Sequence, residues 1–121
     1  MGTTFRRQRI SDLLLAFLAE EIRVLRDPRI SLVTITGIEL SKDYKHAKVF
    51  WSVVDEAGVA CFPDEAHIET ISRALQGVEG LLKKRIGAEL NLKYIPSLHF
   101  KYDSSAQVGS RIDQLLKDAG F

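Results

Sequence analysis

The chain has 121 residues, of which 45% are hydrophobic and 27% are charged, and its formal net charge is +1. This composition excludes a disordered tail and is typical of a globular protein with an apolar core, so we expect residues 1–121 to form a single domain. No apolar run reaches the length of a membrane span, and no secretory signal is visible. The lone Cys61 excludes an internal disulfide and fits a reducing cytoplasm, which is where we expect the protein.

The first predicted element is a helix from Phe5 to Leu25. Its apolar residues recur every three or four positions and predict a stripe that faces the core. They are Ile10, Leu13, Leu14, Phe17, Leu18, Ile22 and Leu25. Asp27-Pro28 should end this helix, because the residue before a proline is pushed out of the α region.

Two strands should follow and form an antiparallel hairpin. Residues 32–40 change their apolar phase midway, so we expect a β-bulge at Gly37. Residues 41–45 form a polar turn that Asp43 shapes. In the second strand, residues 46–54, the apolar residues Ala47, Val49, Trp51 and Val53 share one face. Residues 55–63 are expected to be a loop.

The next helical region carries an unusual pair of glycines. Its apolar stripe comprises Ile68, Ile71, Leu75, Val78, Leu82, Ile86 and Leu90, and Asp64 can cap its start. Gly77-Val78-Glu79-Gly80 lies in the middle, although each glycine costs a helix about 1 kcal/mol relative to alanine. Gly-x-x-Gly is the backbone clamp of nucleic-acid-binding KH modules, but it is weak evidence alone. Because the apolar phase continues across the glycines, we favour a kinked helix with glycines that allow close packing.

A third short strand and a final helix complete the predicted elements. Leu98, Phe100 and Tyr102 alternate with polar residues, which is typical of a half-buried strand. Ser104 or Ser105 can cap a short helix that contains Ile112, Leu115 and Leu116. We therefore predict an α+β fold in which helices cover one face of a three-stranded sheet, in the order used by type II KH domains.

Basic residues form three groups that can contact phosphate. These groups are Arg6, Arg7 and Arg9; Lys42, Lys45 and Lys48; and Lys83, Lys84 and Arg85. A solvated surface role is the alternative for each group. Arg29 can reach RNA or pair with Asp27 or Asp103, and we favour pairing. Phe50 and Trp51 fall on opposite strand faces; we expect both to pack in the fold, although one of them can instead offer a stacking platform for a base.

Several segments together resemble the ribosome-binding factor A family over nearly the whole chain. They are Asp27-Pro28-Arg29-Ile30, Val33-Thr34-Ile35-Thr36, Ser41-Lys42-Asp43, His46-Ala47-Lys48-Val49, Ile95-Pro96-Ser97-Leu98-His99-Phe100, and Tyr102-Asp103-Ser104-Ser105 followed by Gly109, Arg111 and Ile112. The family usually has Ala-x-Gly at a helix kink, where this sequence has Val78-Glu79-Gly80. The resemblance therefore implies a type II KH-like fold with a kinked helix in place of the usual Gly-x-x-Gly loop.

The resemblance implies a non-catalytic assembly factor without a cofactor. Such a factor binds the free small (30S) ribosomal subunit or its precursor, assists late maturation and processing of 16S rRNA, and matters for growth in the cold. It implies other assembly factors, such as assembly GTPases, as further partners. We expect a monomer, because no coiled coil or long exposed strand edge is evident.

Two other functions remain open on the residues alone, a general single-stranded RNA-binding KH module and a small α+β protein-interaction domain. An enzyme is disfavoured, because His46, His67 and His99 lack the spacing of zinc ligands and no phosphate-binding glycine-rich loop is present.

Overall fold

We describe a computed structural model of the chain, which places residues 3–105 and the side chains from Arg6 onward. The elements are α1 (Thr3–Val24), β1 (Val33–Leu40), β2 (His46–Val54), β3 (Ala60–Cys61), α2 (Glu65–Gly77), α3 (Glu79–Glu89) and β4 (Ser97–Tyr102). The predicted last helix, with Ile112, Leu115 and Leu116, lies outside the described residues. No helix in the described part of the chain is long and apolar enough to cross a membrane.

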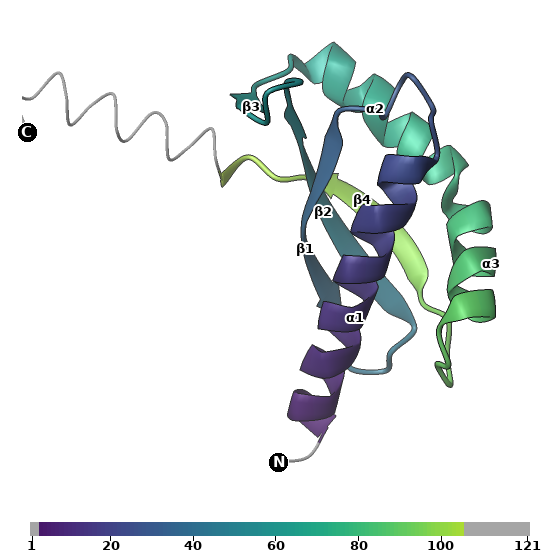
Figure 1. Cartoon of the computed structure of the whole chain (residues 1–121). Coiled ribbons are helices and arrows are strands. Elements are labelled where there is room, and N and C mark those ends of the chain that lie inside the picture. Colours follow the sequence, from purple (N-terminus) through teal and green to yellow (C-terminus); the bar gives the residue numbers. More distant parts are fainter. Residues whose placement is uncertain (1–2, 106–121) are drawn as a thin grey trace, which may run out of the picture.

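Strand β2 is the centre of the sheet (Figure 1). It pairs antiparallel with β1 and parallel with β4, and its last two residues pair antiparallel with β3. The three predicted strands are present, but the predicted 55–63 loop contains a fourth, β3, which was not predicted. Asp55 turns the chain back by accepting the backbone N–H groups of Ala57 and Val59, and Gly58 adopts a φ of 83°. Strand β3 has two residues, too few for an alternating pattern to be read in the sequence.

The predicted bulge in β1 is present, one residue earlier than expected. The register shifts between Ile35 and Gly37, so Thr36 is the extra residue. Both Ile35 and Ile38 therefore face the core side, which a regular strand would not allow. The Thr36 hydroxyl donates to Asp103 Oδ2 at 2.7 Å and so ties the bulge to the end of β4.

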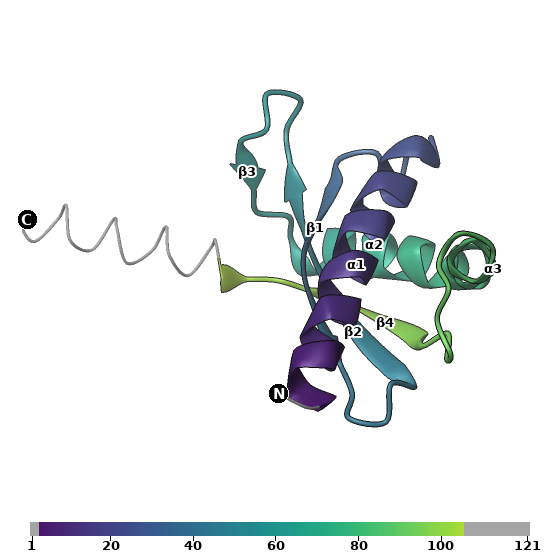
Figure 2. The same ribbon diagram turned by 60° about the horizontal axis from the view of Figure 1, so that its bottom comes forward.

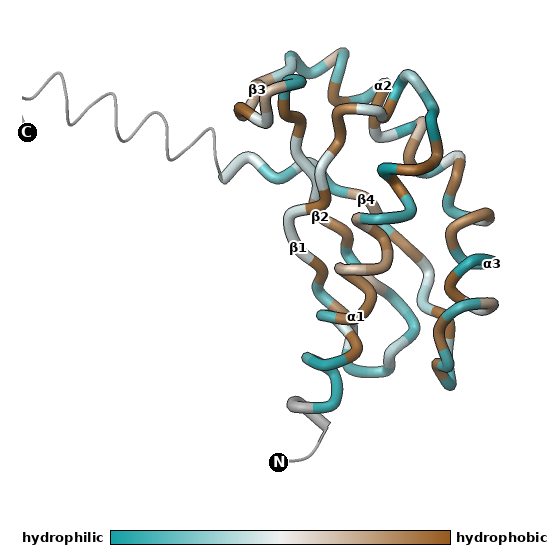
Figure 3. The backbone as a smooth tube through the Cα atoms, in the orientation of Figure 1, coloured by the Kyte–Doolittle hydropathy of each residue, from teal (hydrophilic) through white to brown (hydrophobic). Residues whose placement is uncertain are grey.

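The core lies between the sheet and the helices on one of its faces (Figure 2). As predicted, Ala47, Val49, Trp51 and Val53 of β2 are all buried on this side. Hydrophobic segments lie along the strands and recur along the helices, and the start of α1 is hydrophilic (Figure 3). The assignment of Leu13 to the core was wrong, since its side chain is 46% exposed. Its neighbour Leu14 faces the sheet, and successive helical residues point about 100° apart.

The second helical region is kinked at Val78, the single residue between α2 and α3, with φ −98° and ψ 5°. The kink was predicted, but the packing explanation for its glycines was wrong. A Cβ atom at Gly77 or Gly80 would meet no other atom within 4 Å, and neither residue has a positive φ. These glycines therefore leave bare, exposed backbone on the outer side of the kink.

The kink is fastened to the outer edge of β4. The Gln76 side chain donates to the carbonyl of Leu98 at 3.0 Å, and the N–H of Leu98 donates to Glu79 Oε2 at 2.6 Å. An edge strand exposes unpaired backbone groups, and these two side chains satisfy one donor and one acceptor there. Glu79 is therefore a structural residue of the kink.

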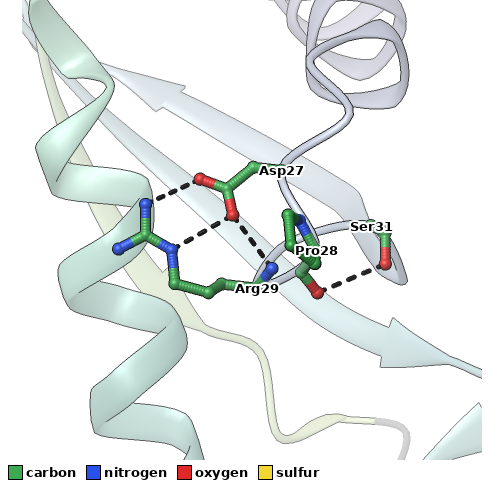
Figure 4. A network of polar contacts seen from close by, with 4 residues as sticks. All are labelled: Asp27, Pro28, Arg29 and Ser31. Carbon is green, nitrogen blue, oxygen red and sulfur yellow. Dashed lines mark hydrogen bonds and ion pairs between the residues drawn. The ribbon is translucent and has the colours of Figure 1, made fainter.

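The turn between α1 and β1 is held by an Asp–Arg pair (Figure 4). The Asp27 carboxylate accepts the backbone N–H of Arg29 at 2.9 Å, its Nε at 3.1 Å and its Nη2 at 2.7 Å. These hydrogen bonds lower the pKa of Asp27 to about 2. Arg29 thus pairs with Asp27, and Asp103 bonds to Thr36 and Ser105 instead. The preference for a structural Arg29 is confirmed.

Candidate nucleic-acid interface

The first basic group lies at the start of α1. Arg6 and Arg9 are exposed and line a groove that also contains Tyr44 of the β1–β2 turn and residues 91–94 of the α3–β4 connection. Arg7 is half-buried and is not part of that lining. Neither Arg6 nor Arg9 makes an ion pair with any residue of the described range. Both guanidinium groups are therefore available to an anion.

The second basic group is divided by the hairpin geometry. Lys42 and Lys45 are exposed in the turn, whose shape depends on Asp43 as predicted. Asp43 Oδ1 accepts the Ser41 hydroxyl at 2.6 Å and the Lys45 N–H at 3.0 Å, and these bonds lower the pKa of Asp43. Lys48 lies on the uncovered face of the sheet, where its register partner in β4 is His99.

That uncovered face carries a pair of neighbouring histidines, which we did not predict from the sequence. His46 Nδ1 lies 3.2 Å from His99 Nε2, and the two rings stand beside Lys48 and Lys101 in a shallow hollow of about 550 Å³. Phe50 is half-buried on the same face, whereas Trp51 is fully buried and packs edge-on against Tyr102. Trp51 is thus a core residue. No three potential metal-ligating side chains gather anywhere in the described range.

The third basic group contains one residue that is already engaged. Arg85 Nε lies 3.3 Å from Glu21 Oε2, and its Nη1 lies 3.6 Å from Glu89 Oε1. The hydrogen bond to Glu21 raises the pKa of Arg85 and links α3 to α1. Lys84 is exposed and Lys83 is half-buried, and neither has an ion-pair partner among the described residues. Lys84 lies one turn after Gly80, so both share one face of α3.

The structure therefore brings Arg6 and Arg9 of the first group to the same end of the molecule as Lys42 and Lys45 of the second. It leaves Lys48 on the uncovered face of the sheet and the third group on α3. The start of α1, the β1–β2 turn and the α3–β4 connection adjoin at that end (Figures 1 and 2). Lys93 and Tyr94 of this connection were not singled out from the sequence. The available signal was an adjacent base and aromatic residue between a helix end and a strand, which is typical of nucleic-acid contacts but weak by itself.

The element order, the kinked second helical region and the flanking of β2 by antiparallel β1 and parallel β4 define a type II KH-like protein, as predicted. The chain belongs to the ribosome-binding factor A family, whose sequence profile matches residues 6–116.

Relatives with this description span most of the chain. Ribosome-binding factor A of Geobacter sulfurreducens is 41% identical over 97 residues, which cover 80% of this chain and 75% of the relative. The crystal structure of ribosome-binding factor A from Thermus thermophilus has a TM-score of 0.66 at 29% identity and covers 79% of this chain and 94% of its own. A homology model of the Thermus thermophilus factor, fitted into a cryo-EM map of its 30S complex, has a TM-score of 0.59 at 28% identity and covers 78% and 92% of the two chains.

Proposed function

We propose that this protein is a non-catalytic assembly factor of the small ribosomal subunit. It binds the free 30S subunit or its precursor in the cytoplasm as a single KH-like domain and assists late maturation and processing of 16S rRNA. The observation that carries the proposal is family membership, since the profile of ribosome-binding factor A matches residues 6–116. The Thermus thermophilus relative fitted into a map of a 30S complex supports the choice of partner.

The charge distribution supports an RNA partner. Arg6, Arg9 and Lys84 are exposed without an ion pair in the described residues, although the net charge of the chain is only +1. Exposed bases without a paired acid can bind phosphate even when the net charge of a chain is small. A factor that prefers one conformation of an RNA shifts the population toward it, which matters most in the cold, where wrong pairings persist.

Co-sedimentation on a sucrose gradient tests the partner directly. The purified protein is mixed with cell extract at low and at moderate salt. We expect comigration with free small subunits and absence from whole ribosomes, with weaker association at the higher salt because of counterion release. Absence from every ribosomal fraction at both salts would contradict the proposal. An association that is unaffected by salt would instead favour a protein-interaction domain.

Two further measurements test the rest of the proposal. A general single-stranded RNA module should bind short RNA as tightly as it binds the subunit, whereas an assembly factor should prefer the particle. Maturation is tested by expressing the chain in a bacterial strain that lacks its own factor. We expect less accumulated 16S rRNA precursor and faster growth in the cold; no change in either would remove the maturation role.

A further inference from the structure

The groove at the start of α1 is larger than the hollow beside the two histidines, with a volume of about 780 Å³ against about 550 Å³. Its apolar lining includes Ile10, Leu13 and Leu92, and its lining residues come mainly from α1, the β1–β2 turn and the α3–β4 connection. Small-molecule and nucleotide sites are usually apolar concavities with a few placed polar groups. This groove has that character, and none of the predicted site residues other than Arg6 and Arg9 belongs to it.

Cations dominate the charged groups of the groove. Arg6, Arg9 and Lys93 line it together with one carboxylate, Asp12, which accepts a hydrogen bond from Gln8 at 2.9 Å. The first turn of α1 contains no acidic residue, and bases follow directly, although the helix dipole favours acids there. The arrangement does not favour helix stability, and it fits a bound anion.

Apolar side chains stand open in the same place. Leu13 and Tyr94 are each 46% exposed, and the Lys93 ammonium lies 5.4 Å from the centre of the Tyr94 ring. Tyr44 also lines the groove, and its φ of 65° belongs to the tight β1–β2 turn, in which its N–H donates to the carbonyl of Ser41 at 3.0 Å.

We propose that this groove holds an unpaired nucleotide of the RNA that the protein binds. The base stacks on Tyr94 against Leu13, and the flanking phosphates contact Arg6, Arg9 and Lys93. Asp12 and Asn91 are the groups suited to the amino and carbonyl edges of the base. An acidic peptide fits less well, because the lining includes an exposed aromatic ring, Tyr94, on which a base can stack. The inference rests on the proposed function for the identity of the RNA.

In the test, the full chain is titrated with a single-stranded RNA hexamer of mixed sequence, and the backbone amide signals are monitored by NMR. We expect the amide signals of Leu13, Asn91 and Tyr94 to shift on titration, and that of Phe62 to stay in place. Phe62 is a matched reference, since it is 46% exposed but lies just after β3, outside the groove. Absence of shifts at the groove amides, or shifts only elsewhere, would overturn the inference.

Binding to the small subunit is measured in parallel for three variants. Tyr94→Ala should weaken association about tenfold, which is the range of one stacked base. Tyr94→Phe should stay within about twofold of the wild type because it keeps the ring, and Phe62→Ala, which removes an equally exposed ring outside the groove, should have no effect. Circular dichroism checks that each variant is folded. Equal binding by Tyr94→Ala and the wild type would overturn the proposed stacking role.

The two proposals fail in different ways. If the wild-type protein does not bind the subunit, the proposed function is contradicted. The hexamer titration still tests whether the groove binds a nucleotide. Photocrosslinking of the subunit complex identifies the occupant: a nucleotide attached to Tyr94 or Lys93 supports the inference. A ribosomal protein attached there would overturn it in favour of a peptide-binding groove.

Discussion

The kink between α2 and α3 and the groove at the start of α1 both carry charged residues, but the charges are used differently. At the kink, Glu79 bonds to the backbone of β4, and the following Arg85 bridges to Glu21 of α1. At the groove, Arg6, Arg9 and Lys93 have no ion-pair partner among the described residues, and apolar side chains stand exposed beside them.

The comparison shows that a charge cluster in the sequence does not reveal which of its members are free. Lys83, Lys84 and Arg85 are adjacent, yet only Arg85 is tied within the described structure. A ligand that contacts Arg85 would first have to break its bonds to Glu21 and Glu89. Arg6 and Arg9 have no such bonds to break among the described residues, so we expect them to contribute more to binding than Arg85.

Removing the three groove cations should have the largest effect. We expect Arg6→Gln, Arg9→Gln and Lys93→Gln together to weaken subunit binding about one hundredfold, at roughly 1 kcal/mol per phosphate contact. The dependence on salt should also become shallower, because fewer counterions are released. Sedimentation at several salt concentrations measures both. A matched variant, Arg23→Gln, Arg26→Gln and Arg73→Gln, removes three exposed bases elsewhere and should bind within a few fold of the wild type.

Removing the hydrogen bond between the kink and β4 should have the next largest effect, which is on stability. Glu79→Ala leaves the N–H of Leu98 without its partner and should lower the free energy of unfolding by about 2 kcal/mol. Urea denaturation measures the change. Glu89→Ala is the control on the same helix, since it removes only a 3.6 Å exposed pair and should cost under about 0.5 kcal/mol. Equal losses for both variants would show that Glu79 does not fasten β4.

Substitution of Gly80, an exposed glycine of the kink, should change stability and binding in opposite directions. Gly80→Ala should raise the free energy of unfolding by about 0.5 kcal/mol, because the added methyl group meets no atom within 4 Å and the helix gains a better former. We also expect RNA to approach this exposed backbone, so Gly80→Ala should bind the subunit several-fold more weakly than the wild type. Unchanged affinity would remove the kink from the interface. Gly58→Ala is the contrast, since its φ of 83° should make that variant less stable.

The smallest expected effect is on stability at acidic pH, and it depends on Asp27. The pKa of Asp27 is held at about 2, below its ordinary 3.8, so the folded state favours the ionised carboxylate. The stabilisation is complete above about pH 4 and is lost as the pH falls through about 2. We therefore expect Asp27→Asn to be less stable than the wild type at pH 7 and the gap to narrow toward pH 2. A gap that does not change with pH would assign the loss to geometry alone.

Much of the fold was readable because periodicity reports burial. The stripe of α1, the alternation from Ala47 to Val53 and the three-four spacing from Ile68 to Leu90 predicted the elements near their observed bounds. Local chemistry also predicted Asp64 as the cap of α2 and Asp43 in the hairpin turn, because these contacts join residues close in sequence. For Arg29 the sequence left Asp27 and Asp103 as possible partners, and the structure shows that Asp27 is the one. Strand β3 was too short to leave a pattern.

The sequence alone therefore determined the order of the elements other than β3 within the described residues, the KH-like class and, through its resemblance, the family. Only the tertiary structure decided which side chains are engaged. It exposed Leu13, bonded Glu79 to β4, paired Arg85 with Glu21, and placed Arg6 and Tyr94 in the lining of one groove. The physical reason is that helix and strand patterns depend on neighbouring residues, whereas these contacts join segments far apart in the chain, whose approach is set by how the helices pack on the sheet.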